Sequence, residues 1–131
     1  DMPAGPSEVL VIGDEYANAS FIAADLLSQA EHGVDSQVIF VTTSEKMVHQ
    51  VKEEIEKQVQ LLPRKAIAQQ ALENSISIVF HSWEDIADFT NEYAPEHLII
   101  NTQNCEAFSE SIKTAGSVFL GPYTPESVGD Y

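Results

Sequence analysis

The sequence predicts an α/β fold: a mainly parallel five-stranded sheet with helices on both faces. Two observations carry this prediction. Five short apolar runs are typical of buried strands, and segments with apolar residues at helical spacing separate them. Strands that alternate with helices form parallel sheets, because each helix returns the chain to the starting edge. We therefore expect a single Rossmann-like, three-layer domain over residues 1–131, with residues 121–131 as a loop tail rich in Pro and Gly.

The strands are expected where the apolar runs are continuous, as in strands buried on both faces. These runs lie at residues 9–13, 37–42, 75–80, 98–100 and 117–120.

Each expected helix begins at a residue that can cap it or, in one case, at a proline. The expected boundaries are Asn18 or Ser20 to Gly33, Ser44 to about Leu61, Pro63 to about Asn74, Ser82 to about Tyr93, and Asn104 to about Gly116.

Composition excludes several classes of partner. The formal net charge is −15, from 21 acidic and 6 basic residues. Nucleic-acid and anionic-membrane surfaces need clustered Lys and Arg, so neither partner is expected. No apolar stretch reaches the length of a membrane span. The single cysteine, Cys105, excludes an internal disulfide and fits a reducing compartment, and we expect a cytoplasmic protein.

The turn after the first expected strand lacks a dinucleotide fingerprint. It reads Gly13-Asp14-Glu15-Tyr16, without the glycines that allow close approach to a pyrophosphate and with two acids where phosphate would lie. The fold alone therefore does not support NAD binding by this domain.

Two histidines lie beside polar residues at the borders of expected elements. Gln29 and His32 are three residues apart near the end of a helix, which is a workable spacing for two metal ligands. The alternative is a structural histidine in the last helical turn, stabilised by the helix dipole. Glu96 and His97 directly precede a strand, and a carboxylate beside an imidazole is a usual composition for acid–base catalysis. The alternative is a solvated strand entrance.

Topology predicts that these residues converge. Ser7 precedes the first strand, His32 ends the helix before the second, and Glu96 and His97 precede the fourth. Strand starts and helix ends share one edge of a parallel sheet, so a site at the amino edge is expected. This edge is opposite to the one where open α/β sheets usually bind ligands. Asp130 lies in the tail and would have to fold back to join them.

The segments 1–11, 25–33, 91–100 and 115–131 resemble signature stretches of histidinol dehydrogenase. The resemblance implies zinc- and NAD-dependent oxidation of L-histidinol to L-histidine through an aldehyde. By position, it implies Glu96 and His97 as the catalytic pair, with His97 as base for the alcohol proton and Glu96 activating water. It implies metal ligation by Gln29, His32 and Asp130, and substrate contacts from Ser7, Gln29, His32, His97 and Asp130.

The resemblance also implies that partners are needed. The family's fourth zinc ligand and its NAD-binding segment have no counterpart in these residues, and the family works as a homodimer. We therefore expect an internal fragment that is inactive without the rest of the enzyme. The alternative is a non-catalytic α/β module that binds a small ligand or a partner protein. Retention of Gln29, His32, Glu96, His97 and Asp130 together favours the enzyme.

Overall fold

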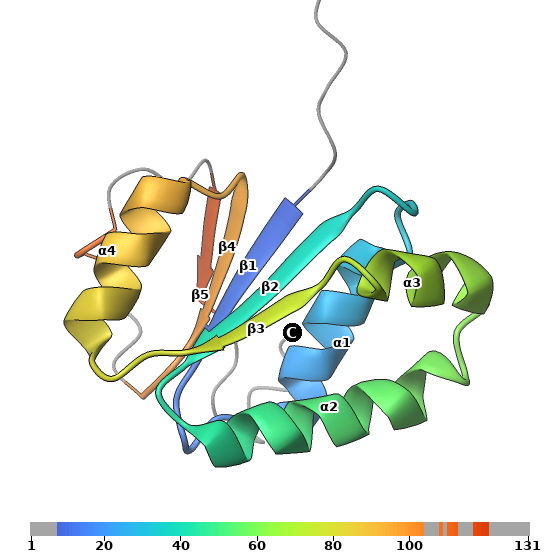
Figure 1. The fold of residues 1–131 in the computed structure, drawn as a ribbon, viewed down its shortest axis with the longest axis horizontal. Coiled ribbons are helices and arrows are strands. Elements are labelled where there is room, and N and C mark those ends of the chain that lie inside the picture. The colour runs from blue at the N-terminus through green and yellow to red at the C-terminus, as the bar shows by residue number, and fades with distance from the viewer. Residues whose placement is uncertain (1–7, 104–107, 109, 113–116, 121–131) are drawn as a thin grey trace, which may run out of the picture.

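The computed structural model describes residues 8–103, 108, 110–112 and 117–120 (Figure 1). Its elements are β1 (Glu8–Gly13), α1 (Ala19–Ala30), β2 (Gln37–Thr42), α2 (Glu45–Val59), α3 (Lys65–Leu72), β3 (Ile76–Val79), α4 (Trp83–Tyr93), β4 (His97–Asn101) and β5 (Ser117–Leu120). The five strands form one sheet in the order β3-β2-β1-β4-β5, and every neighbouring pair is parallel. The predicted five-stranded α/β sheet is confirmed. The helix expected from Asn104 to Gly116 and the loop tail lie largely outside the described residues.

The sheet is the middle of three layers. On one face, alternate residues of β1 and β2 pack against α1 and α2, with Val11, Phe40 and Ile22 among the buried side chains. On the other face, Leu10 and Ile100 pack with Ile86 of α4. Figure 1 shows α1, α2 and α3 on one side of the sheet and α4 on the other. The strands are apolar on both faces because helices cover both of them.

The helix starts follow the capping residues. The side chains of Asn18, Ser44 and Ser82 each accept a backbone N–H from the first turn of α1, α2 and α4, respectively. These three predicted starts are confirmed.

The helix ends differ from prediction by a few residues. Helix α1 ends at Ala30, before Gly33, and Glu31 caps it in a right-handed conformation. Gly33, the expected end of this helix, lies three residues beyond it, and no described glycine has a positive φ. Helix α2 ends at Val59, and α3 begins at Lys65, two residues after Pro63.

The length and hydropathy of the helices were compared with those of membrane-spanning segments. Within the described residues, no helix combines the length and the apolar character that a bilayer crossing requires.

Candidate functional site

Glu96 and His97 lie at the amino edge of the sheet, where α4 gives way to β4. Ala94 ends α4 in a left-handed conformation, and the buried Pro95 follows it. His97 is the first residue of β4 and stands in register with Val9 of β1 and Ser117 of β5. The histidine is therefore held by strands on both sides, whereas Glu96 lies in the preceding turn.

The carboxylate and the imidazole face each other in an open setting. Glu96 Oε1 lies 3.9 Å from His97 Nε2, and the two side chains are 62% and 42% exposed, respectively. This separation allows an ion pair when the imidazole is protonated. Both groups remain accessible to water and to a bound molecule, as proton exchange with a substrate requires.

A second carboxylate, from Glu8, holds the turn that carries this pair. Glu8 Oε1 accepts the backbone N–H of Glu96 at 3.0 Å, and Glu8 Oε2 accepts the Tyr93 hydroxyl at 3.2 Å. Glu8 thereby connects the start of β1 to the end of α4 and to the turn that carries Glu96 and His97. Hydrogen bonds to an ionised acceptor are worth about 1.5–3 kcal/mol, more than neutral ones.

Tyr93 extends the same network to β2. Its hydroxyl lies 3.0 Å from Oε1 of Gln37 as well as beside Glu8, so one proton is shared between two acceptors. Partial burial, with the neighbouring Glu8 charge and hydrogen bond, raises the pKa of Tyr93 to about 12. The phenol is therefore a neutral hydrogen-bond donor at physiological pH, and its hydroxyl contacts both Glu8 and Gln37.

Gln29 and His32 lie at the same edge, at the end of α1. Gln29 is half-buried, and its Nε2 donates to Oγ of the buried Ser36 at 3.5 Å. His32 is exposed and lies two residues beyond the end of α1, so the expectation that it occupies the last helical turn is wrong. A tight turn keeps it close to the helix, because its N–H donates to the Gln29 carbonyl at 3.1 Å.

A continuous set of contacts connects the two predicted segments. Ser36, the partner of Gln29, precedes Gln37, which accepts from Tyr93. Tyr93 in turn donates to Glu8, which holds the N–H of Glu96. The structure therefore brings the Gln29 and Glu96 segments to one edge, as the topology predicts.

The predicted metal set is only partly visible. Gln29 offers an amide oxygen and His32 an imidazole nitrogen, whereas Ser7 and Asp130 lie outside the described residues. Within the described residues, no group of three His, Cys, Asp or Glu side chains could hold a metal ion. Catalytic zinc needs three protein ligands, so the described residues alone do not fit it, and a metal here needs further donors.

Sequence reasoning missed the supporting residues Glu8, Gln37 and Tyr93. They contact one another across 56 and 85 positions of the chain. The one available signal was that Glu8 and Gln37 are polar residues at the first positions of two otherwise apolar strands.

Comparison with known proteins identifies the family of this chain. The profile of the histidinol dehydrogenase family matches residues 1–131. The chain is 56% identical over 131 residues to the histidinol dehydrogenases of Bacteroides thetaiotaomicron and Colwellia psychrerythraea, and covers 31% and 30% of their lengths. A crystal structure of histidinol dehydrogenase from Elizabethkingia anophelis superposes with a TM-score of 0.89 at 58% identity, with 100% of this chain and 30% of that chain covered. The chain thus spans about a third of these relatives, and it belongs to the histidinol dehydrogenase family.

Proposed function

We propose that this chain supplies the acid–base residues with which a histidinol dehydrogenase oxidises L-histidinol to L-histidine. The observation that carries the proposal is the Glu96–His97 pair. Both side chains are exposed at the amino edge, and the backbone N–H of Glu96 donates to Glu8. The family membership supports oxidoreductase chemistry in histidine biosynthesis.

The two residues divide the reaction between them. In the first half-reaction, His97 Nε2 takes the hydroxyl proton of the alcohol while a hydride passes from the same carbon to NAD⁺, which gives the aldehyde and NADH. In the second, Glu96 takes a proton from water as the water oxygen adds to the aldehyde carbon. A second hydride then passes from that deprotonated hydrate to another NAD⁺, which gives the carboxylic acid, and release of its proton to solvent leaves the carboxylate.

Zinc binding is proposed for Gln29, His32 and Asp130, together with a fourth ligand outside this chain. A divalent cation at such a site supplies a Lewis acid that orients the substrate. Gln29 and His32 contribute one oxygen and one nitrogen donor at the end of α1. Ser7, Gln29, His32, His97 and Asp130 are the proposed substrate contacts.

The remaining parts of the reaction come from outside this chain. The turn at Asp14 and Glu15 has no dinucleotide fingerprint, so we propose that NAD binds to another segment of the enzyme. We further propose that the complete enzyme is a homodimer in the cytoplasm and that the 131-residue chain alone does not turn over L-histidinol.

The test uses a complete enzyme in which this chain replaces the matching third of the Bacteroides thetaiotaomicron relative. Single-turnover formation of NADH is measured separately from L-histidinol and from the aldehyde. His97→Ala is expected to slow the step from the alcohol by about 10²–10⁴-fold, because the hydroxyl proton loses its acceptor. Glu96→Gln is expected to slow the step from the aldehyde more than the step from the alcohol.

His49→Ala is the matched control, because it removes an exposed imidazole from α2 and leaves the amino edge intact. It is expected to leave both half-reactions unchanged. Equal loss of both half-reactions in the Glu96 and His97 variants would show that the two residues act as one coupled unit. Full activity in either variant would remove that residue from the proposed chemistry.

A further inference from the structure

The opposite, carboxyl edge of the sheet carries a cavity that the proposed oxidation does not use. Asp14 directly follows β1 and Thr102 directly follows β4, and both line it. In the strand order β3-β2-β1-β4-β5, β2 lies on one side of β1 and β4 lies on the other. The direction in which strands are added therefore reverses between β1 and β4, which makes this position a topological switch point. Ligands of open α/β sheets bind at the carboxyl ends of the strands at such a switch point.

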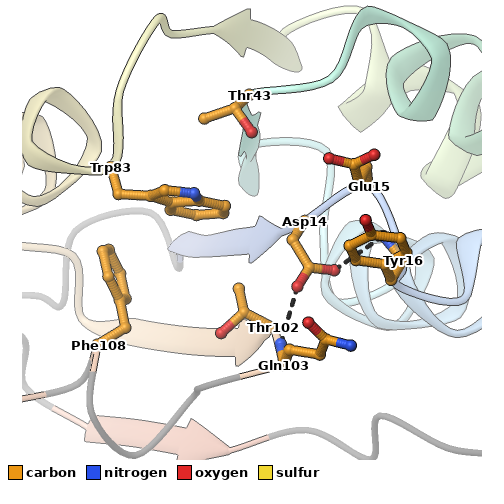
Figure 2. Close-up of a pocket in the computed structure, with 8 residues that line it drawn as sticks. All are labelled: Asp14, Glu15, Tyr16, Thr43, Trp83, Thr102, Gln103 and Phe108. Carbon is orange, nitrogen blue, oxygen red and sulfur yellow. Dashed lines mark hydrogen bonds between the residues drawn. The ribbon is translucent and has the colours of Figure 1, made fainter.

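The cavity has an aromatic wall. Trp83, at the start of α4, and Phe108 meet edge to face with ring centroids 5.5 Å apart at 71°. Figure 2 shows these two rings on one side of the cavity and Tyr16 on the other, with Asp14 and Thr102 between them. Tyr16 is 64% exposed, so its ring is available to a ligand. The volume is about 250 Å³, which suits a molecule much smaller than a dinucleotide.

The charged side chains among the described residues that line the cavity are both acidic. Asp14 is buried, and the backbone N–H groups of Tyr16 and Gln103 donate to its two carboxylate oxygens at 3.0 and 2.8 Å. Glu15 adds a second carboxylate at the rim, and no Lys, Arg or His is among the described residues that line the cavity. This charge disfavours phosphates and other anions, because none of the described residues that line the cavity carries a compensating positive charge.

The hydroxyl of Thr102, which lines the cavity, makes no hydrogen bond. Thr102 is 94% buried (6% exposed), and its Oγ1 has no hydrogen-bond partner. A buried hydroxyl without a partner is unfavourable, and such groups in native proteins are normally satisfied by protein, water or ligand. A ligand with an N–H or O–H donor would satisfy it.

From the carboxylates, the aromatic wall and this hydroxyl, we infer that the carboxyl-edge cavity binds a small organic cation, a protonated primary amine attached to a flat ring. The ammonium group would lie against Asp14 and Glu15, and the ring would pack against Trp83. Carboxylates and aromatic faces both favour a cation, whereas either alone would be a weaker signal. This inference is independent of the chemistry proposed for the amino edge.

Trp83 is the only tryptophan of the chain, so its fluorescence reports on this cavity alone. The probe is 2-phenylethylamine, and 3-phenylpropionate is its anionic counterpart of similar size. The amine is expected to change the Trp83 emission saturably and to shift the indole N–H resonance. The anion is expected to bind at least about tenfold more weakly, since ion pairing becomes repulsion.

The matched variants are Glu15→Gln and Glu53→Gln. Each removes one exposed carboxylate without changing side-chain size, but Glu53 lies on α2, away from the cavity. Glu15→Gln is expected to weaken amine binding about two- to fivefold, as for an exposed ion pair, and Glu53→Gln to leave it unchanged. Absence of a saturable change in both Trp83 signals would overturn the inference, as would equal binding of the anion or equal weakening by the two variants.

Discussion

Ala94 is the residue at which α4 ends before Glu96 and His97, and its backbone is strained. It has φ 53° and ψ 62°, and it is the only described residue other than glycine with a positive φ. For an L-residue this conformation costs roughly 1–2 kcal/mol through contact of Cβ with the carbonyl oxygen. Glycine is the usual residue at such a helix end.

Replacing Ala94 with glycine is expected to stabilise the chain by about 0.5–1 kcal/mol, the relief of strain less the entropy that glycine adds to the unfolded state. Urea unfolding measures the change. Ala87→Gly, in the middle of α4, is the control and is expected to destabilise by about 1 kcal/mol. If both variants lost stability equally, the strain assigned to Ala94 would be absent.

Tyr93 predicts how stability depends on alkaline pH. Its pKa is raised from 10 to about 12, mainly by burial and then by Glu8. The folded state therefore holds the phenolic proton more tightly than the unfolded state. The stabilisation is complete below pH 10 and is lost as the pH rises from 10 to 12. Because the side chain is only partly buried, we expect this loss to be of order 1 kcal/mol after solvent screening.

The measurement compares wild type with Tyr93→Phe across this pH range. The difference in free energy of unfolding between the two is expected to shrink from pH 10 to pH 12, because phenylalanine cannot titrate. Subtraction removes the contribution of lysines, which titrate in both proteins. A constant difference would mean that neither burial nor Glu8 raises the pKa of Tyr93 in the folded state.

At the scale of elements, α1 packs against β1 without room for a side chain at Gly13. A Cβ there would lie 2.6 Å from Ile22 Cδ1 and 3.2 Å from Phe40 Cε1. Both neighbours are buried in the core between the sheet and the helices, so neither can move freely. Position 13 therefore requires glycine because there is no room for a Cβ. Its backbone conformation is open to other residues.

Gly13→Ala is therefore expected to destabilise the chain by about 1–3 kcal/mol through overpacking. Gly33→Ala is the matched control, because a Cβ at Gly33 would meet nothing within 4 Å. Chemical denaturation of the two variants gives the comparison. Similar midpoints for both variants would show that α1 shifts to accommodate the methyl group.

The elements were predictable where their causes are local. Asn18, Ser44 and Ser82 each cap a helix within three residues of their own position, so the sequence indicates all three starts. The end of α1 was not predictable from Gly33, because Glu31 closes the helix without a left-handed residue. Element ends depend on packing, which sequence periodicity does not contain.

The candidate site was predictable in part for the same reason. The location of Glu96 and His97 at the start of a strand follows from local sequence, although β4 begins at His97 and not at Leu98, and parallel topology brings them to the edge that His32 also occupies. The hydrogen bonds of Glu8 and Tyr93 could not be foreseen, since they depend on which strands become neighbours. Knowledge of the strand order would have placed Glu8 beside the Glu96 turn.

The whole molecule carries a large negative charge that opposes compactness. With 21 acidic and 6 basic residues, the net charge is −15, and only one Lys–carboxylate ion pair is found among the described residues, between Lys57 and Glu54. Most of this charge is therefore repulsive, and at 0.1 M salt the repulsion between exposed groups more than about 10 Å apart is largely screened.

We expect the melting temperature to rise as sodium chloride increases from low to moderate concentration, where screening dominates. Differential scanning calorimetry measures the trend. Glu53→Lys reverses one exposed charge on α2 and is expected to make the melting temperature less dependent on salt. A melting temperature that falls with salt would mean that attractive ion pairs outweigh the net repulsion.

The two acids that flank β1 have a mechanical consequence for the sheet. Glu8 accepts the N–H of Glu96 just before β4, and Asp14 accepts the N–H of Gln103 just after it. Side-chain hydrogen bonds thus connect β1 to the residues at both ends of β4. Sliding β4 by one residue along β1 would carry both donors about 3.3 Å out of reach. Both hydrogen bonds therefore oppose a slip in register between β1 and β4, and so they fix where His97 lies along the sheet edge relative to Glu8.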